Sequence, residues 1–170
     1  VFLHHIESCK TMLSTAVFPG SFDPITIGHH GIILRGLDLF ETIIIAIGSN
    51  ADKKSFFSLE SRMQMISLLY DDQPRIQVEV FSGLTIDFCR SHGVRFLLRG
   101  LRTSADFEYE RVVAHANRKL YPDIETVFLL AAPEHSYISS SLVKEILAYG
   151  GDASSFLPPG LKLDACLPGK

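Results

Sequence analysis

The sequence contains 170 residues, of which 46% are apolar, and it carries a formal net charge of −3 at pH 7. A chain of this length and apolar content builds one sizeable core, so we expect a single domain over residues 1–170. The slightly acidic balance excludes the broad positive surface that attracts nucleic acids or anionic membranes, and we predict neither as a partner. A phosphate-bearing ligand would have to be held by local groups.

The start of the chain and its cysteines indicate where the protein works. Residues 1–12 lack the basic start and long apolar centre of a secretory signal, so we interpret them as a leader or frayed arm before a core at about 14–165. Cys9, Cys89 and Cys166 are odd in number and far apart, which indicates a reducing cytoplasm rather than a disulfide framework. The apolar runs are much shorter than the roughly 20 residues of a membrane span, so we expect a soluble, cytoplasmic protein.

Apolar stretches and helical patterns alternate along the chain, which is typical of parallel strands joined by crossover helices. The apolar stretches are rich in β-branched and aromatic residues, as strands are. In chain order the expected elements are a strand at 15–19, a helix at 28–40, a strand at 42–49, a helix at 58–70, a strand at 76–81, a short helix at 84–93, a strand at 94–98, a helix at 103–120 with a T-x-x-D capping pattern, a strand at 126–131 and a helix at 141–151. This order predicts an α/β fold, a single-domain Rossmann-like doubly wound sheet of five parallel strands with flanking helices.

A polar loop follows each expected strand. In a doubly wound sheet such loops meet at one edge, outside the carboxyl ends of the strands, where ligands bind. They carry the cations Lys53, Lys54, Arg99 and Arg102, with few carboxylates beside them. Arginines, backbone amides and helix N-termini attract phosphate, so the sequence predicts a polyphosphate site. The loop sequences are GSFDPITIGHH, SNADKKS, SGLT, RGLR and PEHSYISSS.

Several familiar motifs are missing from the sequence. Neither a G-x-x-x-x-G-K-[ST] loop nor a G-x-G-x-x-G after the first strand occurs, which excludes the usual kinase-like NTPases and dinucleotide enzymes. The His, Cys, Asp and Glu residues lack the spacing of a structural zinc site, and we predict no metal ligand from the protein.

Three motifs occur in one order along the chain: PGSFDPITIGHH, LLRGLRTSADFEYE and YISSSLVKEI. Together they closely resemble the bacterial phosphopantetheine adenylyltransferases of the nucleotidylyltransferase superfamily, and the resemblance runs from about Thr15 to about Leu161. It implies transfer of AMP from ATP to 4'-phosphopantetheine, with Mg²⁺ carried largely by the ATP phosphates. It also implies a homohexamer. In-line attack by the acceptor phosphate would need alignment and charge neutralisation rather than a covalent nucleophile.

The resemblance implies a catalytic set of His29, Lys53 and Arg102. His29, in the T-x-G-H motif that begins at Thr26, would stabilise the transition state, whereas His30 points elsewhere on the helix and is interpreted as structural. Lys53 would contact the acceptor phosphate; Lys54 is its neighbour and competitor, and spacing alone does not separate the two.

The same resemblance implies two sets of binding residues. Ser21 would lie between the substrates, Phe22 would offer its main chain to ATP, and Arg99 would grip the acceptor phosphate, unless it pairs with a structural carboxylate. The acceptor set is Ser21, Lys53, Leu84, Thr85 and Arg99. The ATP set is Ser21, Phe22, His29, Gly100, Leu101, Arg102, Glu110, His135, Ser136, Tyr137, Ile138, Ser139, Ser140 and Ser141.

Asp106, Glu110 and Asn117 form one stripe on the helix expected at 103–120. Glu110 matches an ATP-contacting position. For Asp106 and Asn117 we expect a solvated face or a contact between subunits.

Two other functions fit parts of the sequence. Another nucleotidylyltransferase, such as a nicotinate-mononucleotide adenylyltransferase or a cytidylyltransferase, would have a related first loop but would not generally carry RGLRTSADFEYE. A non-catalytic nucleotide or coenzyme A sensor would be expected to lack His29, Lys53 or Arg99, and all three are present.

Overall fold

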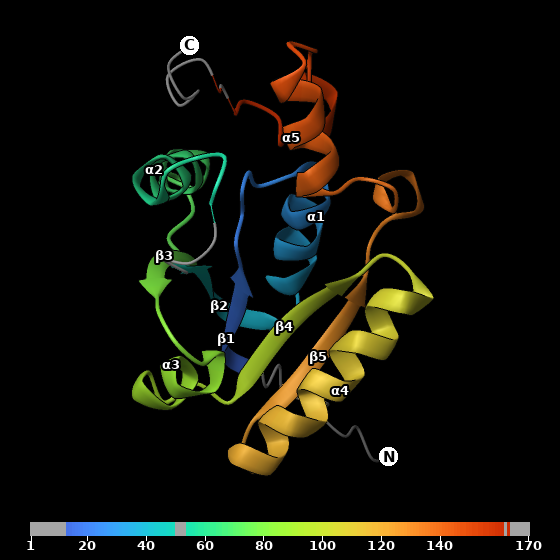
Figure 1. Ribbon diagram of the computed structural model, residues 1–170. Coiled ribbons are helices and arrows are strands. Elements are labelled where there is room, and N and C mark those ends of the chain that lie inside the picture. Colours follow the sequence, from blue (N-terminus) through green and yellow to red (C-terminus); the bar gives the residue numbers. More distant parts are fainter. Residues whose placement is uncertain (1–12, 50–53, 162, 164–170) are drawn as a thin grey trace, which may run out of the picture.

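The computed structural model describes residues 13–49, 54–161 and 163. Its strands form one parallel sheet in the order β3-β2-β1-β4-β5 (Figure 1). The strands are β1 (Leu13–Gly20), β2 (Phe40–Gly48), β3 (Ile76–Phe81), β4 (Phe96–Leu101) and β5 (Glu125–Leu130). The helices are α1 (Ile27–Gly36), α2 (Leu59–Leu69), α3 (Thr85–Ser91), α4 (Ser104–Leu120) and α5 (Ser140–Ala148), with 3₁₀ turns η1 (Pro133–His135) and η2 (Ser154–Phe156).

The predicted doubly wound α/β sheet of five parallel strands is confirmed. The fourth strand is the main correction, because it runs over Phe96–Leu101 rather than 94–98. Its last three residues pair with β5, Arg99 with Phe128, Gly100 with Leu129 and Leu101 with Leu130. These residues therefore belong to the strand and do not follow it.

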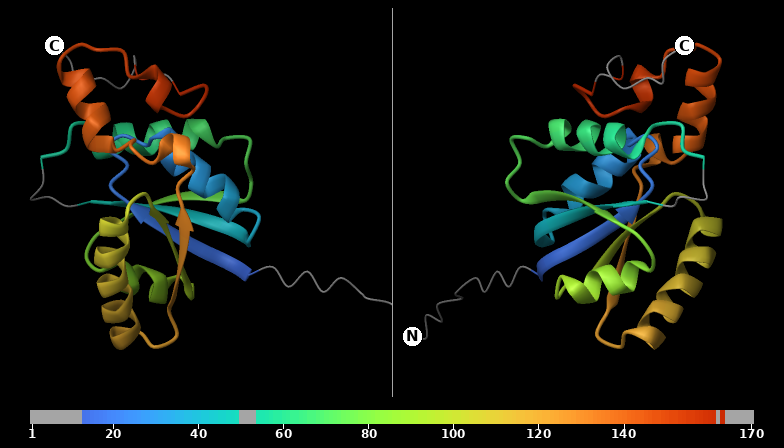
Figure 2. Two further views of the ribbon diagram at one scale, coloured as in Figure 1. Left: turned by 90° about the vertical axis from the view of Figure 1, so that its right-hand side faces the viewer. Right: turned by 60° about the vertical axis from the view of Figure 1, so that its left-hand side comes forward.

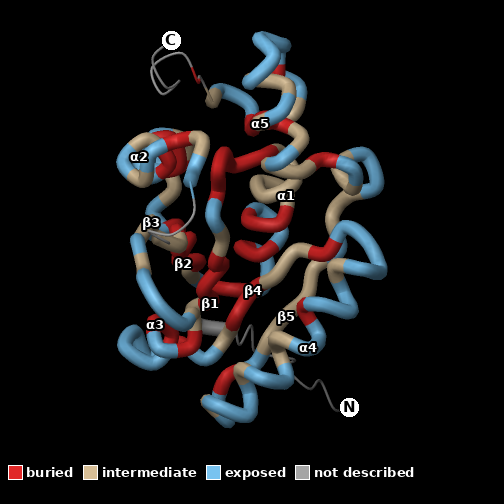
Figure 3. Tube along the Cα trace, viewed as in Figure 1, coloured by how far each residue is buried: buried red, intermediate tan, exposed pale blue. Residues whose placement is uncertain are grey.

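Helices cover both faces of the sheet (Figure 2). α1 and α2 lie on one face and α3 and α4 on the other. The β2 side chains alternate accordingly: Ile43, Ile45 and Ile47 join the cluster that includes α1, while Ile44 and Ala46 join the cluster that includes α3. Burial of both faces explains why β2 is a continuous apolar run. Figure 3 shows this burial concentrated in the strands and in the inner sides of the helices.

A third apolar cluster attaches the C-terminal part of the chain to α2. Val143 of α5 packs in it with Phe57 and Met65, and Leu157 of the tail joins them. This cluster holds the beginning of α5 above the carboxyl edge of the sheet (Figure 1). Among the described residues, no helix is both long and apolar enough to span a lipid bilayer.

The chain reverses its direction of winding between β1, the central strand of the sheet, and its neighbour β4. These strands pair only at Ala16 with Phe96 and Val17 with Leu97. Beyond Val17 they diverge toward their carboxyl ends, whereas the neighbouring β1–β2 pairing continues to Gly20. The divergence leaves a crevice at the switch point, the position where doubly wound sheets bind ligands.

Two glycines of α1 provide a test of the packing against the sheet. A Cβ at Gly36 would lie 2.7 Å from Ile43 Cδ1 and 2.8 Å from Leu98 Cδ2, whereas a Cβ at Gly31 would meet nothing within 4 Å. We predict that Gly36→Ala lowers the free energy of unfolding by about 1–3 kcal/mol through overpacking. Gly31→Ala, the matched control, should raise it by up to about 1 kcal/mol through helix propensity. Urea unfolding measures both, and equal stabilisation by the two changes would contradict the packing described here.

Candidate active site

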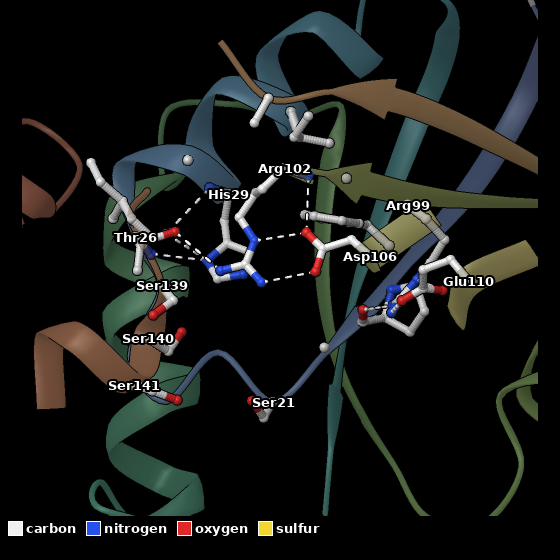
Figure 4. Close-up of a pocket in the computed structure, with 18 residues that line it drawn as sticks. Ser21, Thr26, His29, Arg99, Arg102, Asp106, Glu110, Ser139, Ser140 and Ser141 are labelled. Atoms are coloured by element: carbon white, nitrogen blue, oxygen red, sulfur yellow. Dashed lines mark hydrogen bonds and ion pairs between the residues drawn. The ribbon is translucent and has the colours of Figure 1, made fainter. Parts of the chain in front are cut away.

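A cavity of about 330 Å³ opens at the switch point, and we call it the edge cavity. Its volume is within the range of small-molecule sites. The residues lining it come from the end of β1, the start of α1, β4, α4 and the start of α5 (Figure 4). They are Phe18, Pro19, Gly20, Ser21, Thr26, Gly28, His29, Ile32, Arg99, Gly100, Arg102, Asp106, Glu110, Ala131, Ile138, Ser139, Ser140 and Ser141.

His29 is fixed by the capping box at the start of α1. The Thr26 hydroxyl accepts from the His29 amide at 3.4 Å, and His29 Nδ1 accepts from the Thr26 amide at 3.1 Å. Because a backbone amide can only donate, Nδ1 must be unprotonated, and the neutral ring carries its proton on Nε2. Nε2 is thereby a donor. Figure 4 shows the ring between Thr26 and Arg102.

The surroundings keep this imidazole neutral. Burial is the largest influence on its pKa, followed by the charges of Arg102 and Arg99, and together they lower the pKa from 6.5 to about 4. All three act in the same direction, since low polarity and nearby cations both disfavour imidazolium. At neutral pH His29 is therefore a hydrogen-bond donor without a charge.

Arg102 is held by Asp106, one turn along α4. Its Nε and Nη2 donate to the carboxylate at 3.1 and 3.2 Å, and its amide donates to the same group at 3.0 Å. Nη1 reaches the carbonyl of Ile138 at 3.4 Å. These bonds lower the pKa of Asp106 despite its partial burial. The expectation that Asp106 belongs to a solvated face is wrong, because its carboxylate lines the cavity and orients Arg102, while a contact between subunits stays a prediction.

Arg99 is held in the same manner by Glu110. Arg99 Nε donates to Glu110 Oε2 at 2.9 Å, and Nη2 pairs with Oε1. Nη1 donates to the Pro19 carbonyl at 2.7 Å, across the gap between β1 and β4. The expected scarcity of carboxylates beside the cations is therefore also wrong. Each arginine has a carboxylate partner, which fixes the direction of its planar fork.

Two helix N-termini face the edge cavity. Gly28 and His29 belong to the first turn of α1, and Ser139 caps α5 by accepting from the Leu142 amide at 3.1 Å. Ser140 donates to the Pro24 carbonyl at 2.8 Å, which links α5 to the loop between β1 and α1. The positive ends of two helix dipoles thus favour an anion in the same space.

The structure brings most of the predicted residues together. Of the predicted binding residues, Ser21, His29, Arg99, Gly100, Arg102, Glu110, Ile138, Ser139, Ser140 and Ser141 line the edge cavity. Thr85 lines a second cavity of about 120 Å³ that shares Pro19, Arg99 and Glu110 with the first, and Asn117 lines it too. Lys53 lies outside the described residues, and Lys54 is exposed.

Other predicted residues do not line the edge cavity. Phe22 and Leu101 are buried. Leu84 and Tyr137 expose 57% and 64% of their surface. The Ser136 hydroxyl donates to the Pro133 carbonyl at 2.8 Å. The Nδ1 atom of His135 is buried and has no hydrogen-bond partner among the described residues. Their roles stay predictions.

Asp23 is a buried residue of the site region that the sequence reasoning missed. Its carboxylate accepts from the amides of Phe56 and Phe57 at 3.0 and 2.8 Å and from Lys144 Nζ at 3.3 Å. It thereby joins the first loop to the segment before α2 and to α5. These partners lie up to 121 positions away in sequence, so spacing carries no signal for them.

Comparisons with known proteins give the family of this chain. A family model described as cytidylyltransferase-like matches residues 17–146, which gives the class of protein. A phosphopantetheine adenylyltransferase of Flavobacterium johnsoniae is 51% identical over 148 residues, 87% of this chain and 97% of that protein. One of Thermosynechococcus vestitus is 47% identical over 153 residues, 89% of this chain and 91% of that protein. The chain therefore belongs to the phosphopantetheine adenylyltransferase family, as the three sequence motifs predicted.

A solved structure with low sequence identity shares the fold. A bifunctional NMN adenylyltransferase/ADP ribose pyrophosphatase from Francisella tularensis matches 86% of this chain and 45% of that chain, with a TM-score of 0.67 and 17% identity. At this identity the likeness supports the fold alone.

The state of His29 can be measured directly. We predict that long-range ¹H–¹⁵N NMR of the imidazole shows the Nε2–H tautomer and a pKa near 4, against an ordinary 6.5. Between pH 4 and pH 6.5 this histidine binds more protons in the unfolded chain than in the folded protein. The contribution of His29 to stability is therefore complete above about pH 6.5 and lost as the pH falls through about 4. A ring that titrates near 6.5, or one protonated on Nδ1, would contradict the capping geometry.

Proposed function

We propose that this protein transfers AMP from ATP to 4'-phosphopantetheine, giving dephospho-coenzyme A and pyrophosphate, a step of coenzyme A biosynthesis. The names of its relatives support the reaction. The observation that carries the mechanism is the neutral His29 donor in a cavity shared with two oriented arginines. Such an arrangement stabilises the negative charge that builds up on a phosphoryl group in a transition state.

The proposed transfer is a single displacement. An oxygen of the acceptor phosphate forms a bond to the α-phosphorus of ATP while the bond from that phosphorus to the β-phosphate oxygen breaks, and pyrophosphate leaves with the electron pair. No covalent intermediate with the protein is formed. The residues of this chain align the two reactants and neutralise charge, which is the main source of catalysis in phosphoryl transfer.

Each residue has a proposed task. His29 Nε2 donates to an oxygen on the α-phosphorus. Arg102 and Arg99 each use three of the five N–H groups of a guanidinium on protein acceptors, which leaves two for phosphate oxygens. Arg99 takes the acceptor phosphate, together with Lys53. Ser139, Ser140 and Ser141, at the start of α5, receive the outer phosphates of ATP.

Mg²⁺ would accompany the nucleotide in this scheme. No cluster of three or more His, Cys, Asp or Glu side chains suited to a metal ion occurs among the described residues. The carboxylates of Asp106 and Glu110 already face guanidinium groups. ATP phosphates and water would therefore hold the ion, as is usual for Mg²⁺.

The assembly and location of the protein also stay proposals. A homohexamer in the cytoplasm is what the family resemblance implies, with no nucleic acid or membrane as partner. Apolar side chains exposed on α4 and at the end of β5, Val112, Leu120 and Leu130, support contacts between copies.

The choice of substrate can be tested by pyrophosphate release. With ATP and Mg²⁺, we predict rapid release in the presence of 4'-phosphopantetheine and no release above background with nicotinate mononucleotide. Activity with nicotinate mononucleotide but not with 4'-phosphopantetheine would overturn our proposal and indicate a nicotinate-mononucleotide adenylyltransferase. Tight binding of ATP without turnover on either substrate would favour the sensor.

The role of His29 can be tested with its neighbour as a control. Replacing His29 by Ala removes the Nε2 donor, so we predict a loss of about 10²- to 10³-fold in kcat with little change in the ATP dissociation constant. His30→Ala removes an imidazole whose Nδ1 lies 2.9 Å from the Tyr70 hydroxyl and which does not line the edge cavity. That control should retain its kcat. An unchanged kcat in His29→Ala would remove His29 from the mechanism.

A further inference from the structure

Arg62 is a buried cation beneath the first loop of the site. It belongs to α2, exposes only 4% of its surface and does not line the edge cavity. Its Nη1 donates to the Ser21 carbonyl at 2.6 Å and to the Gly48 carbonyl at 3.4 Å. Both carbonyls lie at the carboxyl ends of strands, Gly48 at the end of β2 and Ser21 just after β1. The guanidinium therefore sits under the edge where ligands bind.

Packing alone gives a poor account of an arginine at this position. Among the described residues Arg62 forms no ion pair, and its buried Nε has no hydrogen-bond partner. A buried charge without a counter-ion is costly, and an apolar side chain of similar length would fill the space at less cost. The contacts that Arg62 does make are concentrated on the main chain of the loop that begins the site.

The bond to Ser21 determines how the next amide points. The Ser21–Phe22 peptide is trans, because the cis bond of this loop is Asp23–Pro24. In a planar trans peptide the carbonyl and the amide N–H point in opposite directions. Since the Ser21 carbonyl is turned toward Arg62, the Phe22 N–H is turned away from it. Ser21 lines the edge cavity, whereas the buried Phe22 does not, so the direction of this peptide sets how Ser21 is presented to the cavity.

The conformation of Phe22 shows that this peptide needs to be held. Phe22 has a φ of 46°, in the left-handed region that side-chain-bearing residues rarely occupy. Such a conformation persists where the surroundings fix it on both sides. Its ring is buried with its centroid 5.2 Å from that of His29, and Arg62 holds the preceding carbonyl. The ring and the guanidinium together fix the residue.

We propose that Arg62 is a positioning residue for phosphate binding. It fixes the Ser21–Phe22 peptide and thereby the position of Ser21 in the edge cavity, and its buried charge makes the region beneath Ser21 more favourable to an anion. This proposal rests on the proposed function in one respect, that phosphate groups bind in this cavity.

Arg75 offers a matched control on the same sheet. Its guanidinium also binds main-chain carbonyls, donating to Leu37, Phe40 and Glu41 at 2.6, 2.6 and 2.8 Å. These carbonyls lie at the opposite edge of the sheet, around the start of β2. Replacing either arginine by Met removes a charge and a set of carbonyl contacts, but only Arg62 lies under the site.

The experiment measures pyrophosphate affinity by calorimetry and steady-state kinetics for the wild type, Arg62→Met, Arg62→Lys and Arg75→Met. We expect Arg62→Met to weaken pyrophosphate binding about tenfold. Its kcat/KM for ATP should fall about 100-fold, because a misplaced donor is costly. Lysine keeps the positive charge but lacks the planar guanidinium. The pyrophosphate affinity and the kcat/KM of Arg62→Lys should therefore lie between those of the wild type and of Arg62→Met. Arg75→Met should lower the melting temperature but leave both parameters unchanged. Equal effects of Arg62→Met and Arg75→Met would overturn the proposal.

The wild-type protein alone provides a second test, which does not depend on whether a variant folds. In an assigned ¹H–¹⁵N spectrum, pyrophosphate bound in the edge cavity should shift the amide signal of Ser21, which lines that cavity, and an unresponsive Ser21 amide would refute the proposal. Failure of the proposed function is a separate result. In that case pyrophosphate would shift the Ser21 amide signal, but the wild type would make no dephospho-coenzyme A.

Discussion

The conformation of the loop between β1 and α1 is the constraint on which the site depends. Three buried groups hold this loop from different directions: Arg62 binds the Ser21 carbonyl, Asp23 accepts two amides and Lys144, and Thr26 caps the helix. Each anchor connects the loop to a different part of the fold. The position of His29 is therefore set by tertiary contacts as well as by the helix that it begins.

The electrostatics of the cavity follow from the same arrangement. Arg99 and Arg102, the two arginines that line the cavity, are each charge-balanced by a neighbouring carboxylate. The imidazole beside them is kept neutral by burial and by those cations. A phosphate group that enters would find oriented N–H donors and two helix N-termini without a proton having to be taken up first. Orientation before binding reduces the reorganisation that a transition state would otherwise require.

The sequence was most informative where the signal is local. The alternation of apolar stretches and helical patterns predicts the sheet and its carboxyl edge. The T-x-x-D pattern predicts the cap at Thr103, whose hydroxyl accepts from the Asp106 amide at 3.1 Å. The family motifs gave the residues that gather around the edge cavity. Local patterns do not, however, show where a strand stops. The sequence pattern places Arg99 in a loop, whereas its pairing with Phe128 of β5 places it inside β4.

What the sequence could not give are contacts between distant segments. The stripe to which Asp106 belongs on α4 predicts a solvated face, whereas in the structure its carboxylate pairs with Arg102. Asp23 and Arg62 gave no signal at all, since their partners become neighbours only in the folded chain. The residues that hold the loop are thus the ones that required a structure.

A structure with a non-hydrolysable ATP analogue tests the central claim most directly. The account predicts that an α-phosphate oxygen lies within hydrogen-bond distance of His29 Nε2, with Nδ1 still bonded to the Thr26 amide and the outer phosphates beside Ser139 to Ser141. Phosphates bound elsewhere on the sheet edge, or a His29 ring released from Thr26 in the complex, would contradict it.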